Sequence, residues 1–181
     1  RDRYRYGHDV FVLAGRISFE PKSISIPIVT STDPDSMKRS TKDMLENDIM
    51  SIDSVVCAAA ISDFVVSDSK SGKIESGNEI SLTLTPFEKI LDQIPQWIKS
   101  FRGDNSGHVI GFKLLSDSNR DQLVNAARSQ IDRVGVSAVV ANDLSQLTGE
   151  GPRALWVTSD NIEELKDTKH IGVAIDALLR A

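Results

Sequence analysis

Short runs of apolar residues alternate along this chain with longer segments in which apolar residues recur at every third or fourth position. The runs predict strands, and the longer segments predict helices with one apolar face. The expected strands are Val10–Leu13, Ile24–Val29, Ser54–Ala60, Glu79–Thr85, His108–Phe112, Ala138–Ala141 and Leu155–Thr158. The expected helices run from Asp33 to about Met50, from Pro86 to Ile98, from Ser118 to Arg133 and from Lys169 to Arg180, and Pro95 is expected to kink or split the second. This alternation predicts a three-layer α/β domain with a mainly parallel sheet, formed by residues 1–181 as one unit.

One segment departs from the alternation. Residues Ile61–Gly77 are polar and rich in Ser, Lys and Gly, which predicts a long loop. Glu79–Thr85 then alternates apolar and polar residues, as a half-exposed strand does. An exposed strand edge needs a partner or a cover. We therefore expect this loop and strand to project as an arm, which a second copy of the chain could cover.

Composition narrows the class of protein. Apolar residues make up 40% of the chain and charged residues 26%, which is ordinary for a globular domain. The net charge is −5 and the basic residues form no cluster, so we do not expect a nucleic-acid-binding protein. A single cysteine excludes a disulfide framework and fits a reducing, cytoplasmic environment. No apolar run approaches the roughly 18 residues of a membrane helix.

The first candidate site lies at the end of the strand around residue 57. In open parallel sheets, ligands bind beyond the carboxyl ends of the strands. The small side chains of Ala58, Ala59 and Ala60 would let a ligand approach the backbone closely there. Asp63 follows with a carboxylate that could accept hydrogen bonds from ribose hydroxyls or an amine. The alternative, in which the alanines are core packing and Asp63 caps a turn, stays open from the spacing alone.

Two further strand ends and one loop carry polar or aromatic residues. Phe112 could stack on a base, and Lys113 beside it could meet a phosphate as a point charge. Asn142 could bond a ligand or hold a neighbouring loop. In the long loop, Lys73 could swing onto a triphosphate. A core Phe beside a surface Lys, a structural Asn and a solvated loop Lys are the alternative interpretations.

Other chemistries find little support in the sequence. His8, His108 and His170 share no metal-ligand spacing, and one cysteine cannot build a thiolate site. The motifs of the serine-hydrolase elbow, the phosphate-binding P-loop and the dinucleotide-binding turn are all missing from the sequence. Cys57 lies within an apolar strand, where we expect it to fill core volume.

The order and spacing of the motifs are more specific than any one of them. The segments AAAISDF, GKI, SLTLTP, GFKL and VVAND, in this order, resemble the phosphopantothenate–cysteine ligase family, from about Tyr6 to Ala181. The resemblance implies a Rossmann-like fold and an enzyme of coenzyme A synthesis that joins 4′-phosphopantothenate to cysteine. It further implies an acyl-nucleotide intermediate formed from CTP or ATP, a requirement for Mg²⁺, and a homodimer.

The resemblance also assigns roles to particular residues. It places the nucleotide against the strand end at Ala58–Ala60, with Asp63 on the sugar or base side and Phe112 lining the base pocket. Lys73 matches a loop lysine that acts on the phosphates and on the acyl-nucleotide, so it is the expected catalytic residue. Asn142 corresponds to the family's A-N pair near the site. Lys113 remains a candidate for phosphate binding on its position alone.

Three departures from the family pattern stand out. The family normally opens with a strand, a G-G-T loop and an N-x-S-x-G helix start, and none of these precedes residue 1, so we expect a member without this front segment. Ser129 stands where many members have a helix lysine, which Arg128 or Arg133 could replace. Leu115 replaces a carboxylate that some relatives carry.

Two other functions therefore remain open at this stage. The same fold could serve as a nucleotide-binding or dimerisation module without catalysis, which the missing front and Ser129 would favour. An unrelated dinucleotide-binding oxidoreductase domain is the other, although the chain lacks the glycine-rich turn of such domains.

Overall fold

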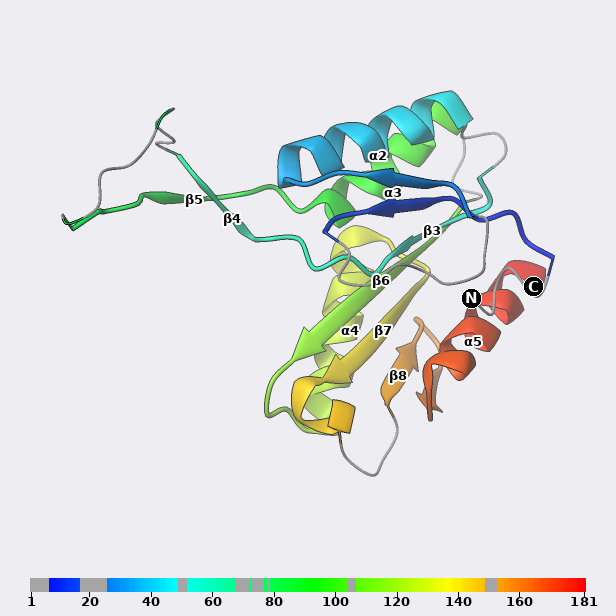
Figure 1. The fold of residues 1–181 in the computed structure, drawn as a ribbon. Helices are drawn as coiled ribbons and strands as arrows, with labels where there is room; N and C mark the ends of the chain where they lie inside the picture. Colours follow the sequence, from blue (N-terminus) through cyan, green and yellow to red (C-terminus); the bar gives the residue numbers. More distant parts are fainter. Residues whose placement is uncertain are drawn as a thin grey trace.

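A computed structural model describes residues 7–16, 26–48, 52–67, 72, 77, 79–103, 107–148 and 153–181. Its central sheet has five strands in the order β3–β6–β7–β8–β9. Strands β3 (Ser54–Cys57), β6 (His108–Leu115) and β7 (Ala138–Asp143) run parallel, while β8 (Ala154–Val157) and β9 (Ile162–Leu165) form an antiparallel hairpin beside β7. Figure 1 shows helices on both sides of this sheet, so the prediction of a three-layer α/β domain is confirmed.

Alternating side chains divide the sheet into two apolar faces. On one face, Val109, Val139 and Ala141 pack with helices α2 (Pro34–Asp48), α3 (Ile90–Arg102) and α4 (Arg120–Val134). On the other, Ile110, Val140 and Trp156 pack with Ala174 and Ile175 of α5 (Thr168–Arg180). Strands β7 and β8 are buried on both faces, which is why their sequences are apolar along most of their length.

Local signals in the sequence set the ends of helix α4. The Asn119 side chain accepts a hydrogen bond from the Gln122 backbone N–H at 2.9 Å, and the Gln122 side chain accepts one from the Asn119 backbone N–H at 2.9 Å. This capping box satisfies two backbone donors at the helix start. At the other end, Gly135 has a φ of 79° and donates its N–H to Ile131, a left-handed conformation that glycine adopts without strain. Helix α4 is thereby fixed over β6 and β7.

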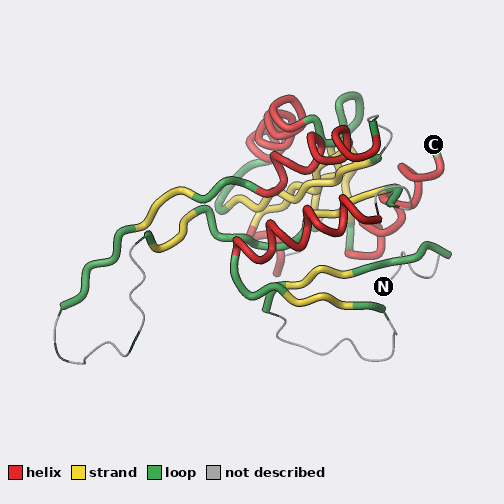
Figure 2. Tube along the Cα trace, turned by 90° about the horizontal axis from the view of Figure 1, so that it is seen from above, coloured by secondary structure: helices red, strands yellow, loops and turns green. Residues whose placement is uncertain are grey.

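A second, two-stranded parallel sheet lies apart from the first. Strand β1 (Val12–Ala14) pairs with β2 (Ile28–Thr30), and α2 packs against β1. Figure 2, which views the molecule from above, shows the two strands running beside the helices and separate from the central sheet. Both strands are shorter than the sequence predicts, and residues 24–25 of the second predicted strand lie outside the described residues.

The expected arm exists, but as a hairpin. Strand β4 (Phe64–Val66) pairs antiparallel with β5 (Leu84–Pro86), and the two project from the body in Figures 1 and 2. The prediction of a continuous loop over Ile61–Gly77 is therefore wrong at β4, whose three residues are too short a run to stand out between polar neighbours. Residues 68–71, 73–76 and 78 lie outside the described residues.

Other predicted boundaries need correction. The strand Ser54–Ala60 ends at Cys57 and is only half-buried, because β3 is an edge of the five-stranded sheet. Pro86 does not open a helix. It pairs with Phe64 at the arm's edge, where its missing N–H costs no hydrogen bond, and α3 begins at Ile90. Helix α3 continues through Pro95 without splitting. Strand β9 was not predicted, since its central Glu163 and Glu164 interrupt the apolar pattern.

Candidate functional site

The parallel strands β3, β6 and β7 end at the same edge of the sheet. Cys57, the last residue of β3, lies level with Gly111 of β6, while β6 continues to Leu115. The residues after β3 therefore lie beside the open edge of β6. A cavity of about 1870 Å³ occupies this region and extends between β1 and β3, which do not pair with each other. It exceeds the roughly 300–1,000 Å³ of a typical ligand pocket, so a ligand at the strand ends would fill only part of it.

Most of the predicted site residues line this cavity. Ala58, Ala59, Asp63, Phe112 and Lys113 all do so. The structure thus brings together residues from two strand ends that are about 50 positions apart in the chain, as the topology of a parallel sheet requires.

Three predicted residues stand apart from this group. Ala60 and Asn142 are not among the lining residues. Asn142 is half-buried within β7, level with Leu114 of β6. Lys73, the expected catalytic residue, lies outside the described residues.

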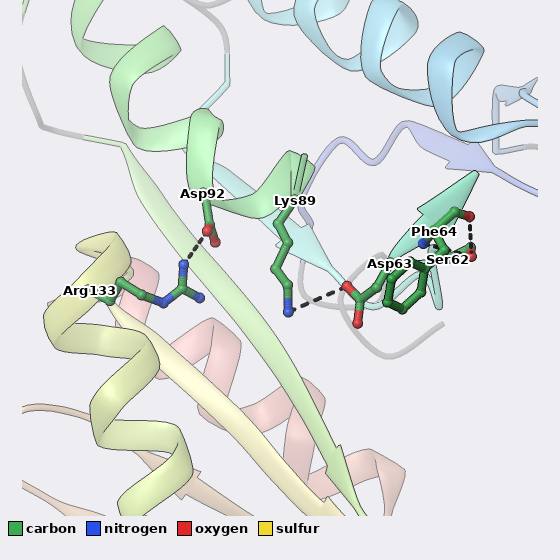
Figure 3. Close-up of polar contacts among 6 residues, drawn as sticks. All are labelled: Ser62, Asp63, Phe64, Lys89, Asp92 and Arg133. Carbon is green, nitrogen blue, oxygen red and sulfur yellow. Dashed lines mark hydrogen bonds and ion pairs between the residues drawn. The ribbon is translucent and has the colours of Figure 1, made fainter. Parts of the chain in front are cut away.

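A short turn after β3 presents Asp63 (Figure 3). The Ser62 hydroxyl donates to the Phe64 carbonyl at 2.7 Å, and the Phe64 N–H donates back to that hydroxyl at 3.2 Å. The Asp63 carbonyl accepts the Phe87 N–H at 2.8 Å, which ties the turn to the end of the arm. The turn leaves the Asp63 carboxylate 61% exposed and 3.4 Å from the Lys89 ammonium. An ion pair this exposed holds the two groups only weakly, so a ligand can replace either partner.

A second ion pair crosses from α3 to α4 on the same side of the cavity. Arg133 donates to Asp92 Oδ2, while Asp92 Oδ1 is buried without a hydrogen-bond partner (Figure 3). Arg133 and Ser129 both line the cavity, whereas Arg128 does not. Of the two arginines that could replace the family's helix lysine, only Arg133 is placed to reach a ligand, and Asp92 already neutralises it.

Asp143 locks the end of β7 in place. Its buried carboxylate accepts the Ser118 hydroxyl at 2.5 Å, the Ser118 N–H at 2.7 Å and the Ser145 N–H at 2.8 Å, and it also accepts the Ser145 hydroxyl. These hydrogen bonds, those from Ser118 first, hold the pKa of the carboxyl well below its usual range. One charged group thus joins the loop before α4 to the turn that leads into η2 (Leu144–Thr148), next to Asn142.

Cys57 lines the cavity as a largely buried thiol. Burial raises the pKa of its thiol to about 12, which keeps it protonated at neutral pH. It packs against the core beneath α2 and α3, so the prediction that it fills volume agrees with its position.

Among the residues of the cavity wall that the sequence reasoning missed are Lys89, Asp92 and Gln130. Lys89 had been placed inside a helix that in fact starts after it. Gln130 follows Leu123 and Ala127 on the face of α4 that is buried against the sheet, and its spacing of seven and three positions from them was the available signal.

The described residues offer little for a metal ion on their own. In that part of the chain, no three His, Cys, Asp or Glu side chains gather around one point. Asp63 and Asp92 face the cavity as separate carboxylates. Mg²⁺ commonly binds through one or two carboxylates together with substrate phosphates. This donor set therefore fits an ion that arrives with a phosphate and not one held in a cage of protein ligands.

Comparison with known proteins identifies the family. Residues 1–178 match the family described as the DNA/pantothenate metabolism flavoprotein C-terminal domain. The chain belongs to this family. A coenzyme A biosynthesis bifunctional protein CoaBC from Thermococcus kodakarensis is 35% identical over 113 residues, which are 62% of this chain. The match covers 27% of that relative, so the chain spans about a quarter of its length.

Solved structures support the same fold. The DNA/pantothenate metabolism flavoprotein of Streptococcus pneumoniae superposes with a TM-score of 0.81 at 20% identity, covering 99% of this chain and 83% of its own. A Cab2 mutant in complex with phosphopantothenate-cysteine gives a TM-score of 0.60 at 20% identity, covering 86% of this chain and 52% of its own. The Rossmann-like fold expected from the resemblance is confirmed. In the described part of the chain, no helix is long and apolar enough to cross a membrane.

Proposed function

We propose that this chain is the nucleotide-binding ligase domain of a phosphopantothenate–cysteine ligase. Membership of the family over residues 1–178 is the observation that carries the proposal. The reaction joins 4′-phosphopantothenate to cysteine after a nucleoside triphosphate, CTP or ATP, has activated the pantothenate carboxylate. The product is an amide, so the enzyme forms a carbon–nitrogen bond.

The cavity residues suit the binding part of this reaction. The side chains of Ala58 and Ala59 are small enough for a nucleotide to lie against the end of β3. Asp63 would accept hydrogen bonds from the ribose hydroxyls once Lys89 turns away from it. Lys113 would meet a phosphate, and Phe112 would contact the base. The assignment of Ala60 and Asn142 rests on the resemblance alone, since neither lines the cavity.

Charge neutralisation is the main demand of the chemistry. A triphosphate and a carboxylate repel each other, so cations must offset both as they approach. Mg²⁺ bound to the phosphates would supply such charge. Lys73 would act next to the phosphates and the acyl-nucleotide. In the full-length protein, Lys73→Ala should lower turnover without lowering the melting temperature, while Lys99→Ala, an exposed helix position, should change neither.

We also propose that the protein is a homodimer joined through the arm. Phe64, Val66, Leu82 and Leu84 are 52%, 41%, 63% and 57% exposed. Phe64 and Val66 lie on one face of β4, and the cross-strand neighbours of that face include Leu84. An apolar face of this kind on a projecting hairpin is unfavourable in water and suits a second, identical hairpin.

One observation favours a second function, a nucleotide-binding module without catalysis. Ser129 lines the cavity where the family often has a lysine, and the nearby Arg133 is already paired with Asp92. Such a module would bind CTP or ATP and dimerise but would release no pyrophosphate.

Pyrophosphate release distinguishes the two. The full-length protein would be mixed with 4′-phosphopantothenate, Mg²⁺ and either CTP or ATP, with and without cysteine. Release that requires phosphopantothenate and one of the nucleotides would support the ligase and identify its nucleotide. Nucleotide binding without release would support the module, and neither binding nor release would refute both.

A further inference from the structure

Gln130 is a polar side chain at a position that the fold would ordinarily fill with an apolar one. It lies on the sheet-facing side of α4 and is 8% exposed. The other buried polar residues of the described chain, Ser31 and Asp143, both make side-chain hydrogen bonds. Within the described residues, Gln130 makes none. A largely buried amide without a protein partner needs solvent or a ligand to satisfy its hydrogen bonds, so its presence calls for a physical reason.

Gly111 of β6 makes room for this amide. A Cβ atom at Gly111 would lie 2.5 Å from Gln130 Nε2 and 3.1 Å from Leu91 Cδ2. The amide therefore occupies the space that any other residue at position 111 would fill. Gln130 also lines the cavity, and Asp92 Oδ1 is the one fully enclosed side-chain polar atom without a partner among the described residues. The Gln130 amide thus keeps open surface, which the cavity provides.

The charges around Gln130 are balanced. On the α3 and α4 side of the cavity, Asp63 pairs with Lys89 and Asp92 pairs with Arg133. Lys113, two residues beyond Gly111 on the same face of β6, also lines the cavity and is closer to the strand end. A phosphate would pair with the Lys113 ammonium. The Gln130 amide, which lies further from the strand end, would instead offer one donor and one acceptor to an uncharged group.

We propose that the Gln130 carboxamide recognises an uncharged, planar donor–acceptor edge of the bound ligand, and that the lack of a side chain at Gly111 makes room for it. This inference rests on the proposed function, since it deepens the assignment of that ligand. The nucleobase of the triphosphate has such an edge and would pair with the carboxamide through two hydrogen bonds. The amide of 4′-phosphopantothenate is the other uncharged, planar group of the substrates, and because its N–H and C=O point in opposite directions it would pair with the carboxamide through one hydrogen bond.

The test uses Gln130→Met, which keeps the length of the side chain and removes its donors and acceptor. Dissociation constants would be measured by calorimetry for CTP, ATP, 4′-phosphopantothenate and inorganic tripolyphosphate, with Mg²⁺, in the full-length protein. We expect one organic ligand to bind about tenfold more weakly, while tripolyphosphate binds as before. The ligand that weakens identifies whether the base or the amide is recognised. The melting temperature should not fall, because no hydrogen bond of the free protein is lost. Gln96→Met, at an exposed position of α3 away from the cavity, is the matched control.

Gly111→Ala provides a second, independent variant. Its Cβ would push the flexible end of Gln130 away, so it should weaken the same ligand as Gln130→Met does. Unchanged dissociation constants in both variants would overturn the proposal while leaving the ligase intact. An equal loss of affinity for tripolyphosphate would overturn the proposal by showing that Gln130 contacts phosphate. A lower melting temperature for Gln130→Met would overturn it by indicating a structural role. If the unaltered protein binds neither nucleotide nor phosphopantothenate, the proposed function fails and this inference fails with it.

Discussion

The arm allows a quantitative prediction, because its apolar side chains are exposed in the described structure and association would bury them. We consider Leu84→Ser, which removes an apolar side chain from β5 and adds no charge. Leu84 pairs with Val66 across the hairpin and is 57% exposed. The substitution should therefore act mainly on association, with a smaller loss of stability in the isolated domain from the part of Leu84 that is already buried.

The magnitude follows from the exposed fraction. Burying a whole leucine side chain contributes roughly 1.5–3 kcal/mol. About half of Leu84 remains to be buried, which gives roughly 1–1.5 kcal/mol for each copy. A twofold-symmetric dimer buries the residue twice, so the variant should lose about 2–3 kcal/mol of association free energy. The dissociation constant of the dimer should then rise by about 30- to 150-fold.

Sedimentation velocity over a range of concentrations measures this directly. Thr83→Ser is the control, because the neighbouring side chain points to the opposite face of the hairpin and should leave the constant unchanged. A protein that stays monomeric at every concentration would refute the dimer. A dimer whose constant is the same with Leu84 and with Ser would refute the arm as its interface.

Three further predictions concern the frame around the cavity. Asn119→Ala removes the capping box of α4 and should lower the free energy of unfolding by about 1 kcal/mol in urea titrations, whereas a change near zero would mean that the cap is not formed. The depressed pKa of the Asp143 carboxyl means that its hydrogen bonds stabilise the fold fully above the ordinary carboxyl pKa of about 4 and lose this effect as the pH falls below it. Wild type should therefore lose stability between about pH 4 and pH 2 more steeply than Asp143→Asn, and parallel curves would count against the role of Asp143. Asp63→Asn should weaken nucleotide binding without lowering the melting temperature, since its ion pair with Lys89 is exposed, and equal dissociation constants would remove Asp63 from the site.

Much of the fold follows from periodicity because the sheet is buried on both faces. The apolar runs of β6, β7 and β8 are typical of such strands, and each was predicted with its start within one residue of the observed one. The elements that were missed lie at edges, where burial no longer dictates the sequence. Strand β9 has two central glutamates, and β4 has three residues between polar neighbours. In both cases strand pairing, which the sequence does not display, decides the structure.

A similar distinction separates the cavity residues that could be predicted from those that could not. Ala58, Asp63 and Phe112 were accessible to sequence reasoning because one topological rule places all ends of parallel strands at one edge. Lys89 was not, since its position depends on where a helix begins. Arg133 was named only as one of two arginines, and the rotation of α4 over the sheet decides between them. Predicting the role of Gln130 requires two elements to be considered together. The spacing of Gln130 from Leu123 predicts a side chain that points toward the sheet. The amide has room there only because Gly111 of β6 lies beneath it, and this packing of α4 on β6 cannot be read from the sequence. A polar residue within an apolar helical stripe, opposite a glycine within an apolar strand, is therefore a pair to seek in sequences of this fold. Neither residue alone departs far enough from ordinary core composition to be noticed.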